Sequence, residues 1–108
     1  MKLTCSKSGA ACVIKIEDRM DAQSGPDLEK ECHRLIQEGE KLIVIDLESL
    51  RYISSAGLRS LLVVGQRLKE AGGSLRVCCL AGIVKQVFAA AGFASIFPVF
   101  DSVEAAIK

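Results

Sequence analysis

The 108-residue sequence has little aromatic content, no tryptophan, two prolines and a single histidine. It has no apolar run of 18 residues, so we expect no helix that spans a membrane. The first residues, MKLTCSKSGA, lack the apolar core of a secretory signal, and we therefore expect a soluble protein of the cytoplasm. The 14 basic and 13 acidic residues leave no excess of either sign, so the charge does not favour nucleic acid or an anionic membrane as a partner.

Metal ligands and catalytic motifs are also scarce. The five cysteines include no C-x-x-C pair, and His33 has no second ligand in its sequence context, so we expect no metal and no cofactor. Adjacent residues of a strand point to opposite faces, which predicts that Cys78 and Cys79 point apart and form no disulfide. The motif Gly-x-Ser-x-Gly, a Walker loop and a dinucleotide fingerprint are all missing. An enzyme is therefore not expected.

What is present is a globular composition, half hydrophobic and a quarter charged, in a chain that we assign to one domain, residues 1–108. Apolar runs predict strands over residues 1–7, 10–16, 41–47 and 74–80, and a short strand near 96–100. Ser8-Gly9 is typical of a hairpin turn between the first two strands. The run KLIVIDL is nearly all apolar, as in a strand buried on both faces.

Helical periodicity appears between these strands. Apolar stripes predict four helices, over residues 25–39, 55–73, 81–92 and 101–108. In the second helix the expected buried stripe is Leu58, Leu61, Leu62, Gly65 and Leu68. In the third it is Ile83, Val84, Val87, Phe88 and Ala91. Asp101 and Glu104 have the spacing of a capping box at the start of the last helix.

The order of these elements predicts an α/β fold, because strands that alternate with helices pair mostly in parallel through right-handed crossovers. We expect a mixed, mostly parallel sheet of four to five strands with about four helices.

The segment YISSAGLRSLL, residues 52–62, carries the main functional signal. It places Ser54 and Ser55 between the strand that ends near Leu47 and a helix that begins near Ala56 or Gly57, at a strand end where binding residues often collect. One serine is explained by an N-cap. A glycine in the first helical turn is explained if something approaches the backbone closely there.

Four segments together resemble the STAS domain family, in which the anti-sigma factor antagonists are found. VIDLESLRYISSAGLRSLL is similar to the family's signature, with a Ser-rich turn and a Gly-Leu pair that opens a helix. RMDAQSGPDLEKE resembles the family's Asp-Ala turn, AGGSLRVCCL its Gly-Gly turn, and AGFASIFPVFDSVEAAI its closing segment. The resemblance covers nearly the whole chain, and it implies a STAS fold.

The resemblance also implies partner switching. The unphosphorylated protein would bind an anti-sigma factor that is also a serine kinase and so release the sigma factor. Phosphorylation of a serine in the turn would block binding, and a serine phosphatase would reset the cycle. In the best-known family pattern the accepting hydroxyl precedes the glycine, but here that position is Ala56, so Ser55 is the favoured acceptor and Ser54 the alternative. The implied partner-binding residues are Asp21, Asp46, Ser54, Ser55, Ala56, Gly57 and Leu58.

Two less specific interpretations remain open. Asp21 and Asp46 are also explained as a turn residue and a strand-end cap. A phosphorylation-independent STAS adaptor, or a ligand-binding subunit of a transport or signalling complex, would account for Ala56 without further assumption.

Overall fold

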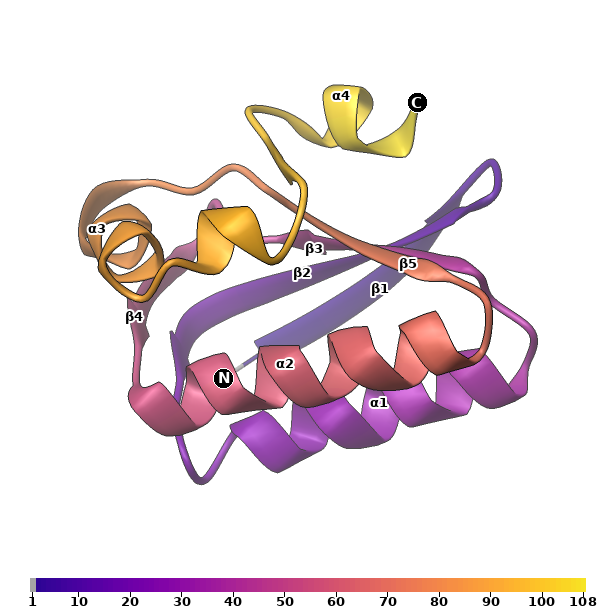
Figure 1. Ribbon diagram of the computed structural model, residues 1–108, viewed down its shortest axis with the longest axis horizontal. Helices are drawn as coiled ribbons and strands as arrows, with labels where there is room; N and C mark the ends of the chain where they lie inside the picture. Colours follow the sequence, from indigo (N-terminus) through magenta and orange to yellow (C-terminus); the bar gives the residue numbers. More distant parts are fainter. Residues whose placement is uncertain (1) are drawn as a thin grey trace.

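The computed structural model describes residues 2–108 and has an α/β architecture (Figure 1). Along the chain it contains β1 (Lys2–Ser8), β2 (Ala11–Met20), α1 (Gly25–Gln37), β3 (Leu42–Asp46), β4 (Leu50–Ile53), α2 (Ser55–Glu70), β5 (Ser74–Cys78), α3 (Gly82–Ala90), a 3-10 turn η1 (Phe93–Ser95), β6 (Val99–Phe100) and α4 (Val103–Ile107). Met1, which we included in the first strand, lies outside the described residues.

The strands form one mixed sheet in the order β1-β2-β3-β5-β6, with β4 paired to β2 beyond the end of β3. Within residues 2–108, only the β1–β2 hairpin is antiparallel, and Gly9 adopts a φ of 59° at its turn, as Ser8-Gly9 predicted. The mixed, mostly parallel sheet and the four α-helices are thus confirmed. The expected strand count was too low, because the six strands include β4, whose sequence LRYI carries two exposed polar side chains and no continuous apolar run.

Helices cover both faces of the sheet. Helices α1 and α2 lie side by side beneath it, α3 lies near β4, and α4 lies on the opposite face (Figure 1). On β3, Ile43 and Ile45 belong to the main core between the sheet and α1 and α2, whereas Val44 packs with Ala106 of α4. This arrangement confirms that KLIVIDL is a strand buried on both faces.

A bulge in β2 determines where the candidate turn lies. Residues Ala11–Lys15 pair with β3, but the register shifts at Asp18, which adopts a φ of 72°, and Asp18–Met20 pair with β4 instead. A bulge bends its strand and increases the local twist. The end of β2 therefore leaves β3 and runs beside β4, which leads directly into α2.

Several details of the predicted helices differ. The cap of α4 is Ser102, whose Oγ accepts a hydrogen bond from the Ala105 amide at 3.1 Å, so the predicted capping role of Asp101 was wrong. On α3 the buried side chains are Val84 and Phe88, whereas Ile83 is 56% exposed. Gly92, expected to end α3, has a φ of 73°, which suits a glycine.

Candidate functional site

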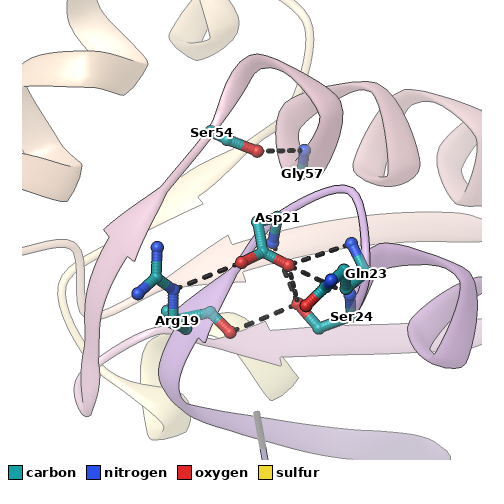
Figure 2. A network of polar contacts seen from close by, with 6 residues as sticks. All are labelled: Arg19, Asp21, Gln23, Ser24, Ser54 and Gly57. Atoms are coloured by element: carbon teal, nitrogen blue, oxygen red, sulfur yellow. Dashed lines mark hydrogen bonds and ion pairs between the residues drawn. The ribbon is translucent and has the colours of Figure 1, made fainter.

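The Ser54–Ser55 turn joins β4 to α2. The structure corrects our expectation that it directly follows the strand near Leu47, since β4 lies in between. Ser54 caps the helix, because its Oγ accepts a hydrogen bond from the Gly57 amide at 3.1 Å (Figure 2). Its carbonyl accepts one from the Leu58 amide at 2.9 Å. Its own amide donates to the Met20 carbonyl at 3.0 Å. Ser54 is thus held by both the helix and the end of β2.

Ser55 occupies a different environment although it is adjacent in sequence. It is the first residue of α2 and is exposed. The first amides of a helix and its dipole both favour a negative charge at this end. The Ser55 side chain is accessible from solvent, and the capping hydrogen bond of this turn is made by Ser54.

Gly57 and Leu58, two of the predicted partner-binding residues, are buried. A Cβ atom on Gly57 would lie 2.6 Å from the Met20 carbonyl oxygen, so the glycine permits close packing of α2 on β2. Leu58 is 8% exposed and belongs to the core. Sequence reasoning correctly inferred that something approaches Gly57 closely, but the approaching group is the protein's own backbone.

Asp21 anchors the loop that follows β2, beside the turn. Its carboxylate accepts hydrogen bonds from the amides of Gln23, at 3.0 Å, and Ser24, at 3.1 Å, and from the Ser24 hydroxyl at 3.1 Å (Figure 2). Arg19 lies 3.2 Å away through its Nε. These contacts, with the bond from the Ser24 amide first, lower the pKa of Asp21 below its ordinary value of 3.8. The structure thus gives Asp21 the role of a turn residue at this position.

Asp46 lies away from the Ser54–Ser55 turn. It is the last residue of β3 and pairs with Lys15 of β2, whereas the turn adjoins Met20 at the far end of the same strand. Its Oδ1 accepts a hydrogen bond from the Glu48 amide at 3.0 Å, as in a strand-end cap. One of its carboxylate oxygens lies within 4.8 Å of the Sγ atoms of Cys78 and Cys79.

Four exposed residues near the turn were not among the predicted site residues: Arg19, Tyr52, Arg59 and Leu62. Arg19 and Tyr52 face each other across β2 and β4, with the guanidinium carbon 5.0 Å from the ring centroid. On α2, Arg59 is exposed, and Leu62 is 39% exposed although we placed it in the buried stripe. We use the name turn surface for Tyr52, Ser55, Arg59 and Leu62.

Helical geometry explains why Leu62 belongs to this surface. Residues spaced by four and then three positions share one helix face, so Ser55, Arg59 and Leu62 lie in a row. Val64, which we left out of the buried stripe, is 1% exposed and belongs to the core. The spacing from Ser55 was the signal in the sequence that could have identified Leu62.

The chain belongs to the STAS domain family, since the family model for the STAS domain matches residues 3–106. It is 41% identical over 106 residues to the "Putative anti-sigma factor antagonist BtrV" of Bordetella bronchiseptica, with 98% of this chain and 91% of that protein covered. Neither the family description nor the name of this relative describes an enzyme, in agreement with the expectation that the chain is not one.

Solved structures show the same fold at lower identity. An anti-sigma factor antagonist from Mycobacterium paratuberculosis superposes with a TM-score of 0.87 at 20% identity, over 98% of this chain and 90% of that one. The phosphorylated form of SpoIIAA, a Bacillus cell fate determinant, superposes with a TM-score of 0.76 at 18% identity, over 98% and 96% of the two chains. In the described residues, 2–108, no helix has both the length and the apolar character needed to cross a membrane.

Proposed function

We propose that this protein is an anti-sigma factor antagonist that works by partner switching in the cytoplasm. Its unphosphorylated form binds an anti-sigma factor with serine kinase activity and releases the sigma factor. Phosphorylation of Ser55 blocks that binding, and a serine phosphatase restores it. The homology to the Bordetella protein supports the class of function, and SpoIIAA, which shares the fold, exists in a phosphorylated form.

The observation that carries the choice of Ser55 is the contrast between the two serines. Ser54 is partly buried and its hydroxyl oxygen accepts the capping hydrogen bond, whereas Ser55 is exposed at the first helical position. A kinase must place the acceptor hydroxyl in its own active site, and Ser55 can be presented without breaking a bond that holds the turn. Ser54 is the less favourable acceptor for the same reason.

The turn surface supplies the contacts for the partner. Tyr52 and Leu62 offer apolar area, and Arg59 offers a positive charge next to Ser55. Large aromatic side chains and arginine are enriched among the residues that dominate binding energy at interfaces. A partner with an acidic rim fits this surface, and a phosphate on Ser55 would repel it.

Phosphorylation need not change the fold to act as a switch. A phosphoserine adds nearly two negative charges, which the start of α2 tolerates and a docked acidic surface does not. Arg59, four residues after Ser55, is placed to pair with the phosphate within the same helix. Such a pair would also withdraw the arginine from the partner. A loss of about 3 kcal/mol, roughly a hundredfold in affinity, would make the switch effective.

The test combines phosphorylation with binding. Incubation with the cognate kinase and ATP, followed by peptide mass spectrometry, should place phosphate on Ser55, and Ser55→Ala should abolish it while Ser54→Ala should not. In calorimetric titration with the anti-sigma factor, Ser55→Asp should bind far more weakly than Ser55→Ala. Equal affinities for these two variants would overturn the switch. An unmodified protein that still binds its partner would favour the adaptor interpretation.

A further inference from the structure

The ends of β3 and β5 bring together three potential metal ligands that lie apart from the turn surface. Asp46 is the last residue of β3 and Cys78 the last of β5, and the two are paired in register. One carboxylate oxygen of Asp46 and the Sγ atoms of Cys78 and Cys79 all lie within 4.8 Å of one another.

The convergence of the two thiols contradicts our prediction that they point apart. The alternation of side chains holds only within a strand, but β5 ends at Cys78 and Cys79 adopts a φ of 65°. The Cys78 carbonyl accepts a hydrogen bond from the Leu47 amide at 3.1 Å, and the Cys79 amide donates to the Phe100 carbonyl at 3.0 Å. The neighbouring chain segments therefore hold both cysteines in this arrangement.

The spacing suits a single ion. Zn²⁺ binds thiolate sulfur at about 2.3 Å in a tetrahedral arrangement, which places two ligand sulfurs about 3.8 Å apart. The three ligand atoms lie within 4.8 Å of one another, so they need to approach by no more than about 1 Å to reach this separation. The hydrogen bond from the Glu48 amide to Asp46 Oδ1 orients the carboxylate, as outer contacts do in metal sites.

The cluster of Asp46, Cys78 and Cys79 can be reached from solvent, and its charge favours a metal ion. Cys78 is fully buried and Asp46 nearly so, but Cys79 is only partly buried and opens the cluster to solvent. The carboxylate of Asp46 lies within 4.8 Å of both thiols, and its negative charge favours a cation at this position.

We propose that Asp46, Cys78 and Cys79 form a binding site for a thiophilic divalent cation of the Zn²⁺ or Cd²⁺ class. Two thiolates and one carboxylate bind the ion, and water completes the tetrahedron. Binding releases two thiol protons to solvent and involves no change of oxidation state. The inference is independent of the proposed switch, because none of the three ligands belongs to the turn surface.

The experiment titrates the reduced, metal-free, full-length protein with Cd²⁺. Sulfur-to-cadmium charge-transfer absorption, native mass spectrometry and proton release into a weak buffer should show one ion per chain and two protons released. Cys79→Ser and Asp46→Asn should each weaken binding by roughly tenfold or more. Cys5→Ser, which changes an exposed cysteine of β1, is the matched control and should bind as the unmodified protein does.

Circular dichroism and thermal unfolding of each variant separate loss of ligands from loss of the fold. If the buried Cys78→Ser variant does not fold, Cys79→Ser and Asp46→Asn still decide the question. The proposal is overturned if the unmodified protein gives no charge-transfer band, or if Cys79→Ser binds Cd²⁺ as tightly as the unmodified protein. It is also overturned if the band is lost in Cys5→Ser instead.

Discussion

The hydroxyl oxygen of Ser54 lies 3.1 Å from the amide nitrogen of Gly57 and accepts its hydrogen bond, while Ser55, between them in the sequence, is exposed to solvent. This single contact gives two adjacent serines different physical roles. Ser54 stabilises the start of α2, and Ser55 is accessible from solvent. The two roles can be separated by substitution.

Ser54→Ala should lower the free energy of unfolding by about 1 kcal/mol, because it leaves an amide of the first helical turn without its cap. Ser55→Ala, which removes no capping bond, should change the stability by less than about 0.5 kcal/mol. Urea denaturation followed by circular dichroism measures both. A larger loss for Ser55→Ala than for Ser54→Ala would show that the capping roles are assigned wrongly.

Gly57→Ala should destabilise the protein by about 1 to 3 kcal/mol, because the added methyl group meets the Met20 carbonyl oxygen of β2 at 2.6 Å. Gly65→Ala is the matched control on the same helix. There the methyl group also meets an atom at 2.6 Å, but the atom belongs to the Phe97 ring and not to the backbone, and the gain in helix propensity of up to about 1 kcal/mol offsets part of the cost. Thermal unfolding should therefore rank Gly57→Ala as the more damaging change.

Leu58→Ala and Leu62→Ala should have different profiles, since Leu58 is 8% exposed and belongs to the core whereas Leu62, one turn later, is 39% exposed. Leu58→Ala should cost about 2 to 5 kcal/mol of stability through the cavity that it leaves in the core. Leu62→Ala should change stability by less than about 0.5 kcal/mol and should weaken binding of the anti-sigma factor by roughly fivefold or more. Calorimetry with the partner and denaturation of the free protein measure the two effects, and unchanged binding by Leu62→Ala would remove Leu62 from the turn surface.

Asp21→Asn should make the free energy of unfolding less sensitive to a fall in pH. The pKa of Asp21 is lowered in the folded protein, so its carboxylate contributes stability above its ordinary pKa of 3.8, and this contribution is lost as the pH falls through the folded value. Denaturation across a pH series should show the variant less stable near neutral pH, with the difference closing below pH 3.8. A constant difference at all pH values would mean that the lost charge is not the cause.

Much of the architecture followed from periodicity. The hairpin at Ser8-Gly9, the doubly buried β3 and the helices α1 and α2 depend on local patterns of residues, and the structure contains each of them. β4 was missed because LRYI has only two buried side chains, and its pairing depends on the bulge at Asp18, 32 positions before Leu50. A register shift in a distant strand leaves no local periodic signal.

For the candidate site, too, the sequence predicted some features and the tertiary structure decided others. The sequence by itself determined the STAS family, the serine-rich turn and the presence of an N-cap, because these depend on residue types at fixed short spacings. Only the tertiary structure decided that Gly57 and Leu58 face the core, that Leu62 joins Ser55 and Arg59 at the surface, and that Asp46 meets Cys78 and Cys79 instead of the turn. These outcomes depend on which face of an element is covered and on how strands far apart in sequence are paired. Both are set by long-range packing, which no short stretch of sequence encodes.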